Sequence, residues 1–265
     1  MRFTPLGYRW WVTLSTSSSN PYVVIRQRFD RLDLLRGVSM LWMAAFHFCF
    51  DLNHFGLWRQ NFYVDPFWTV QRVCIVSLFL FCAGVGQAVA IDQHQSAARF
   101  WRRWVRIAAC AALVTVGSSV MFPRSFISFG VLHGIAVMLV VMRISAGAGR
   151  WLWLFGAVAL LMPHLVQHAW FDTRWTNWIG LVTRKPATED FVPVLPWLGV
   201  MWWGLASGQW LLAERRSWLT GALPRALQPV AAVGRWSLSF YMLHQPVLIG
   251  LLALGVALSA RWSGR

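Results

Sequence analysis

The feature that most constrains this chain is a succession of apolar stretches, each about twenty residues long. A stretch of that length crosses the hydrocarbon core of a bilayer as an α-helix, which bonds its own backbone polar groups. Charged residues make up 12% of the chain, about half the share found in soluble domains. The sequence therefore predicts an all-α polytopic membrane protein, a bundle of about seven transmembrane helices. The predicted helices cover Leu34–Leu57, Val70–Ile91, Val105–Phe122, Phe126–Met142, Trp151–Trp170, Val192–Ala213 and Ser237–Ala260.

Arginine is concentrated in alternate connections between these stretches, and this asymmetry predicts their orientation. The arginines precede the first helix, join the second to the third, the fourth to the fifth, and the sixth to the seventh. Connections rich in arginine stay in the cytoplasm, so the N-terminus is predicted to be cytoplasmic. The same bias accounts for the formal charge of +15, and we predict no nucleic-acid partner.

The chain is predicted to form a single domain. Residues 1–27 are expected to be a flexible cytoplasmic lead-in, residues 28–260 the transmembrane domain, and residues 261–265 an extracytoplasmic tail. Only Pro123–Ser125 separate the third predicted helix from the fourth, which indicates a tight turn.

The first apolar stretch contains three ionisable residues, Arg36, His47 and Asp51. An arginine or aspartate at the centre of a membrane helix costs about 2.5–3.5 kcal/mol, so such residues usually face the interior of a bundle. His47 and Asp51 are four residues apart and share one helical face. The carboxylate could orient the imidazole and raise its basicity, as in hydrolytic triads. We predict a polar site near mid-membrane.

Two further histidines fall inside predicted helices, His133 in the fourth and His244 in the seventh. A neutral imidazole is readily buried and can accept or pass a proton near neutral pH. Each could instead be a hydrogen-bonded packing residue. Because His47 already has a carboxylate neighbour, we favour a polar path lined by all three histidines.

Four arginines follow one another at spacings of three and four where the third helix begins. They are Arg99, Arg102, Arg103 and Arg106. A guanidinium group matches phosphate oxygens, so the cluster could bind a phosphorylated ligand. Basic residues beside a membrane helix also bind lipid headgroups and set topology. The residues alone leave both interpretations open. The four cysteines have no metal-like spacing, and His164 and His168, four residues apart, could hold a metal but have no acidic or cysteine partner close in sequence, so we predict no metal site.

Six blocks, in order along the chain, resemble the heparan-alpha-glucosaminide N-acetyltransferase catalytic-domain family, part of the transmembrane acyltransferase superfamily. The blocks are RLDLLRGVSMLWMAAFHFCFDLNHFG, SLFLFCAGVGQAVA, RFWRRWVRI, FGVLHGI, DFVPVLPWLGVMWWG and GRWSLSFYMLHQPVL. The resemblance covers about Arg28 to Leu252. This chain resembles a short bacterial member, because it lacks the extra spans and the large luminal region of the eukaryotic enzymes.

The resemblance implies an acyl-CoA co-substrate, most simply acetyl-CoA, bound on the cytoplasmic side, and no metal or haem. It implies transfer to a glycan or other envelope acceptor at a bacterial inner membrane, through a histidine within the bilayer. His47 and Asp51 match the catalytic position, and Asp33 and Arg36 belong to the same motif. The arginine cluster from Arg99 to Arg106 matches the turn expected to meet the CoA phosphates. A homo-oligomer is left open.

Two other functions are compatible with the intramembrane residues. A small proton-coupled transporter could use the same histidines and Asp51 as a relay, but it does not explain the arginine cluster, and the chain shows no inverted repeat. A b-type haem protein could take histidines from two helices as axial ligands. We favour the membrane acyltransferase because it uses both the intramembrane histidines with Asp51 and the arginine cluster from Arg99 to Arg106.

Overall fold

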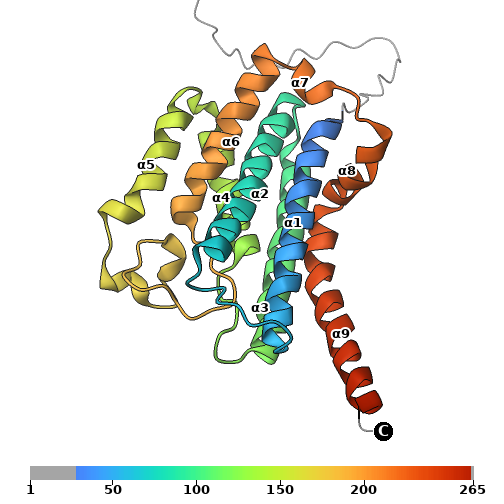
Figure 1. Ribbon diagram of the computed structural model, residues 1–265. Coiled ribbons are helices and arrows are strands. Elements are labelled where there is room, and N and C mark those ends of the chain that lie inside the picture. The colour runs from blue at the N-terminus through green and yellow to red at the C-terminus, as the bar shows by residue number, and fades with distance from the viewer. Residues whose placement is uncertain (1–27, 264–265) are drawn as a thin grey trace, which may run out of the picture.

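The computed structural model describes residues 28–263, and this part of the chain is built from helices without strands (Figure 1). The longer helices are α1 (Asp30–His54), α2 (Pro66–Asp92), α3 (Ala97–Met121), α4 (Val131–Ser145), α5 (Trp151–Leu165), α6 (Val194–Glu214), α8 (Gln228–Arg235) and α9 (Ser237–Ser263). The short turns are η1 (Ala146–Ala148), η2 (Ala169–Asp172), η3 (Asn177–Ile179), α7 (Ser217–Thr220) and η4 (Arg225–Leu227). The predicted lead-in over residues 1–27 lies outside the described residues.

Each of the seven predicted apolar stretches contains a helix. Among the described residues, five helices are long and apolar enough to cross a membrane: α1, α2, α3, α4 together with η1, and α9. The apolar helix α5 has 15 residues and is shorter. The helix α6 is not one of the five; it carries four tryptophans and an extended residue at Leu195 near its start. The all-helical fold is confirmed, whereas seven crossings and a cytoplasmic N-terminus stay predictions.

Several predicted boundaries differ from the structure. The third helix already begins at Ala97 rather than Val105, so the arginine cluster lies within it. The fourth helix begins at Val131 rather than Phe126, because Ile127 turns back to bond with the end of α3: its N–H donates to Ser118 Oγ (3.0 Å), and its carbonyl accepts from Thr115 Oγ1 (2.8 Å). The fifth ends at Leu165 rather than Trp170, just after Pro163. The helix α9 continues to Ser263, into the stretch predicted as a tail.

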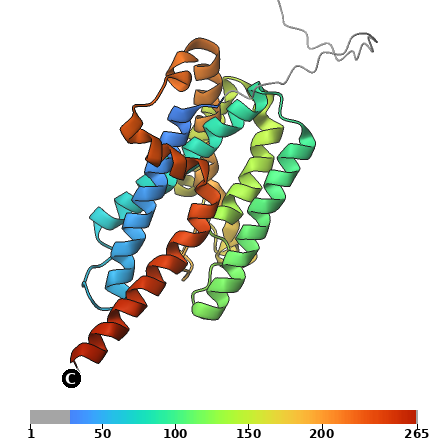
Figure 2. The ribbon, with the colours of Figure 1, turned by 90° about the vertical axis from the view of Figure 1, so that its right-hand side faces the viewer.

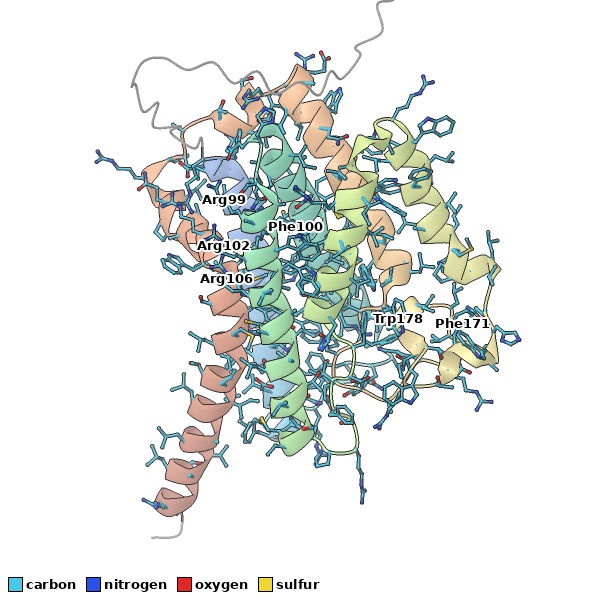
Figure 3. All side chains as sticks on the ribbon, turned by 180° about the vertical axis from the view of Figure 1, so that it is seen from behind. Arg99, Phe100, Arg102, Arg106, Phe171 and Trp178 are labelled. Atoms are coloured by element: carbon cyan, nitrogen blue, oxygen red, sulfur yellow. The ribbon has the colours of Figure 1, made fainter. Side chains whose placement is uncertain are left out.

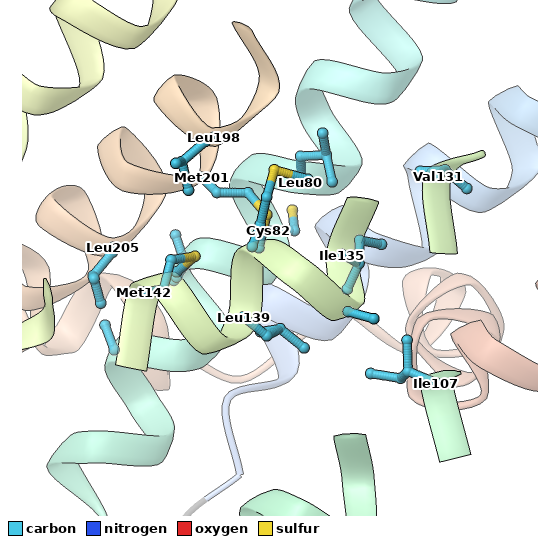
Figure 4. Packing of buried hydrophobic residues seen from close by; sticks show 14 of the residues in the cluster. Leu80, Cys82, Ile107, Val131, Ile135, Leu139, Met142, Leu198, Met201 and Leu205 are labelled. Atoms are coloured by element: carbon cyan, nitrogen blue, oxygen red, sulfur yellow. The ribbon is translucent and has the colours of Figure 1, made fainter. Parts of the chain in front are cut away.

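The helices α2 and α6 form the most closely packed pair, with α5 against the outer side of α6 (Figure 1). Glycines make this approach possible, because a Cβ at Gly84 would collide with the backbone of Met201 and one at Gly204 with that of Phe81. Leu80, Met142 and Met201 fill the space beside this contact (Figure 4).

The helix α1 lies between α2 on one side and α8 and α9 on the other, while α3 and α4 stand on a further face (Figures 1 and 2). The arginine-rich connections meet at one end of this bundle, where α7 and α8 also lie. From that end α9 runs down beside α1 and extends past it (Figure 2). The bundle therefore has one strongly basic end.

Replacement of Gly84 by alanine tests the close contact between α2 and α6. The new methyl group would overlap the Met201 carbonyl, so we expect the free energy of unfolding to fall by about 1–3 kcal/mol. Gly117→Ala in α3 is the control, because nothing lies within 4 Å of its Cβ position. Thermal unfolding in detergent measures both, and equal midpoints would contradict the packing described.

Candidate active site

A pocket of about 490 Å³ opens at the basic end of the bundle, between α1, α2 and the first turns of α3. Its volume falls in the range of small-molecule sites. Five of its lining residues are arginines, and one is an aspartate. The charged residues are Arg28, Asp33, Arg36, Arg99, Arg103 and Arg106. The pocket is therefore strongly cationic and suits an anionic ligand.

The predicted arginine cluster divides between this pocket and the surface. Arg99, Arg103 and Arg106 line the pocket, at positions that share one helical face. Arg102 does not line it; this residue is exposed, and its backbone carbonyl accepts a hydrogen bond from Arg106 Nε (3.4 Å). Figure 3 shows the positions of Arg99, Arg102 and Arg106 along α3. Arg28, one of the arginines that precede the first predicted helix, completes the lining.

Asp33 is the buried carboxylate of the pocket, and three arginines surround it. It accepts hydrogen bonds from Arg28 Nε (2.9 Å) and Arg36 Nη1 (3.2 Å), and Arg235 Nε of α8 lies 3.9 Å away. The other end of the Arg36 guanidinium lies against Gly86, where the missing side chain leaves room for it. Asp33 and Arg36, both predicted to support the site, thus form one cluster in the pocket.

A second group of polar residues lies further along α1, where it meets α9. The rings of His47 and His244 face each other with centroids 5.2 Å apart. The buried Asp51 accepts a hydrogen bond from Gln245 Nε2 (2.8 Å). Within residues 28–263 no hydrogen bond joins Asp51 to His47, so the carboxylate is oriented by α9 rather than by its own helix neighbour. Gln245 is not among the site residues predicted from the sequence. A polar side chain within an apolar helix is the feature that could have identified it.

His133 does not belong to this group. Its Nδ1 accepts the N–H of Gly130 (3.2 Å), so the ring hydrogen is on Nε2, which lies 3.1 Å from Thr115 Oγ1. Both ring nitrogens are thus used at the start of α4. Among the described residues, no hydrogen bond or ring contact joins His133 to His47 or His244, and a polar path lined by all three stays a prediction.

The pocket and the histidine pair are separate in this conformation. His47 follows Arg36 by eleven residues, a rise of about 16 Å along the helix, and does not line the pocket. The side chains of Met40 and Met43 are buried on α1 between the two positions. A ligand in the pocket would have to displace these methionines to approach the histidines.

A smaller pocket of about 80 Å³ lies toward the opposite end, with Arg72, Lys185 and Asp190 in its lining. Asp190 accepts a hydrogen bond from the N–H of Val131 (2.8 Å) at the start of α4. Burial raises the pKa of Asp190, while burial and then the nearby Arg72 lower the pKa of Lys185. We interpret these charges as part of the connection that fixes the start of α4.

The fold and the site define a membrane-embedded helical bundle with a cationic pocket at one end and a half-buried imidazole pair. Residues 28–246 match the family described as Heparan-alpha-glucosaminide N-acetyltransferase, catalytic, and the chain belongs to that family. Comparisons with curated proteins and with solved structures gave no significant match. The family is one of transferases, so the protein is a transmembrane acetyltransferase-like protein.

Loss of the Asp33 carboxylate should weaken the basic end of the bundle. Asp33→Asn leaves Arg28 and Arg36 without their counter-charge, and we expect the free energy of unfolding to fall by about 1–3 kcal/mol. Asp92→Asn is the matched control, because its ion pair with Arg216 is more exposed and should contribute less than about 1 kcal/mol. Chemical denaturation in detergent compares the two, and an equal or larger effect at Asp92 would contradict this ranking.

Proposed function

We propose that this protein is a membrane acyltransferase that moves an acyl group, most simply acetyl, from cytoplasmic acyl-CoA to a glycan or other envelope acceptor. The acceptor would lie outside the membrane or within it, and the membrane would be the inner membrane of a bacterium. The observation that carries the proposal is the arginine-lined pocket in a chain that belongs to an acetyltransferase family.

Donor binding is assigned to the pocket. CoA carries phosphate groups, and guanidinium groups bind phosphates through paired hydrogen bonds. The pocket is lined by Arg28, Arg99, Arg103 and Arg106. It is also lined by Arg36, which forms an ion pair with Asp33. The lining holds five arginines and one aspartate, and this excess of positive charge favours an anionic ligand.

The transfer step is assigned to the imidazole pair. The acceptor's hydroxyl or amine attacks the thioester carbonyl carbon, an imidazole takes its proton, the carbon–sulfur bond breaks, and the thiolate leaves and is protonated to CoA. A transient acyl-imidazole on His47 would divide the same exchange into two steps. The thioester arm would pass Met40 and Met43, whose unbranched side chains change rotamer readily. A proton-coupled transporter is not favoured by any observation on the described residues.

Replacement of pocket arginines should abolish donor binding selectively. In Arg99→Ala/Arg103→Ala, we expect the thermal stabilisation of the purified protein by acetyl-CoA to disappear, because two phosphate-binding groups are lost from the lining. Arg102→Ala is the matched control, since Arg102 belongs to the same cluster outside the lining, and it should retain the shift. The same loss in both variants would indicate a general effect of charge and count against the pocket.

Replacement of His47 should block the transfer step and leave donor binding intact. We expect His47→Ala to lower acetyl-CoA-dependent CoA release in native membranes by about 10²–10⁴-fold, the usual contribution of a residue that transfers a proton in catalysis. His164→Ala, at the exposed end of α5, is the control. Release at the wild-type rate by His47→Ala would remove His47 from the mechanism.

A further inference from the structure

Three buried polar atoms without hydrogen-bond partners gather where α1 meets α9. They are Asp51 Oδ2, His244 Nε2 and Gln245 Oε1. His244 and Gln245 are neighbours on α9, and Gln245 bonds directly to Asp51. A buried polar atom without a hydrogen-bond partner costs free energy of folding. Such atoms can mark a place where a ligand supplies the missing partner.

All three atoms are hydrogen-bond acceptors. A backbone carbonyl can only accept, so the contact of 2.7 Å between His244 Nδ1 and the Tyr241 carbonyl places the ring hydrogen on Nδ1 and leaves a lone pair on Nε2. Gln245 uses its amide nitrogen on Asp51 Oδ1, so its Oε1 can only accept. The remaining oxygen of the Asp51 carboxylate accepts as well. The cluster is therefore complementary to a group that donates several hydrogens.

We propose that Asp51, His244 and Gln245 form the subsite that binds the hydrogen-bearing end of the acyl acceptor, with Gln245 as its positioning residue. This inference rests on the proposed function and names the site of its second substrate. Its ligand chemistry is a hydroxyl or amine whose N–H or O–H groups meet the three acceptors. Gln245 turns one Asp51 oxygen toward α9 and leaves the other for the ligand.

The position of the subsite fits the direction of transfer. Along α1 the order is Arg36 in the donor pocket, then His47, then Asp51, about 6 Å beyond His47. His244 Nε2 takes the acceptor's proton as its oxygen or nitrogen bonds to the acyl carbon and the carbon–sulfur bond breaks. His47, with its ring centroid 5.2 Å from that of His244, lies on the donor side. It takes this proton from His244 and passes a proton on to the thiolate, so both imidazoles end neutral. Donor and acceptor then approach the imidazole pair from opposite sides.

The decisive variant is Asp51→Asn. The asparagine oxygen can keep the bond from Gln245, but a donating amide then replaces the free carboxylate oxygen and opposes the acceptor's own hydrogens. Gln245→Met is the second variant, since it retains the length of the side chain and removes the amide. Gln209→Met on α6 is the matched control, because Gln209 likewise donates to a helix partner, the Ala146 carbonyl (2.8 Å), outside the site.

Native membranes containing each variant are given acetyl-CoA labelled in the acetyl group, and label in the membrane fraction is measured separately from free acetate. Thermal stabilisation of the purified variants by acetyl-CoA is measured in parallel. We expect transfer to fall about 10- to 100-fold in Asp51→Asn and Gln245→Met, with acetyl-CoA stabilisation unchanged, and Gln209→Met to transfer as the wild type does.

Wild-type transfer by both variants would overturn the subsite and leave the proposed function in place. If the variants lose both acetyl transfer and thermal stabilisation by acetyl-CoA, the residues have a general structural role. That result would also overturn the proposed subsite. A wild-type protein that neither binds acetyl-CoA nor labels the membrane fraction would overturn the subsite together with the proposed function.

Discussion

The basic end of this bundle depends on one buried carboxylate. Arg28, Arg36 and Arg235 would repel one another at such short distances, and Asp33 lies among all three with its oxygens 2.9–3.9 Å from their nitrogens. Through Arg235 the same carboxylate reaches α8, whose Gly234 packs against the backbone of Asp33 and Gly37 with no space for a side chain. Asp33 thus holds the wall of the pocket, and together with Asp30, which accepts from Arg235 Nη2 (3.1 Å), it holds the segment that leads into α9.

The two polar sites are related through α1, since each takes residues from it. Contacts with α2, α8 and α9 restrict the position of α1, so the spacing between Arg36 and Asp51 is set by helix geometry rather than by a loop. Sites on rigid helices hold their groups at a constant separation. What can change is the packing between them, where the flexible side chains of Met40 and Met43 lie. The two sites are therefore held at a constant separation, while the side chains packed between them can change rotamer.

The sequence predicted what depends on local pattern. Long apolar stretches located the helices, and the Asp33–Arg36 motif and the intramembrane His47 were found because charge and imidazole are unusual in an apolar helix. Contacts between distant segments were not predictable in this way. Gln245 bonds to Asp51 across 194 residues, and His133 proved to serve the start of α4 through Gly130 and Thr115. Arg102 differs from its neighbours only by the direction in which its helix face points, which depends on how α3 packs.

The polar residues of the second site also explain how α9 stays with the bundle. Its apolar membrane-length window, Ser237–Ser259, buries none of its residues, and nothing lies within 4 Å of the Cβ positions of Gly250 and Gly255. Lipid tails are as apolar as leucine, so apolar side chains alone do not drive two membrane helices together. A hydrogen bond between Gln245 and Asp51 and the contact between His244 and His47 add to the packing of Phe240 and Tyr241 against the core. The residues proposed for catalysis therefore also join α9 to α1, and the association of these two helices and the geometry of the site are set by the same few side chains.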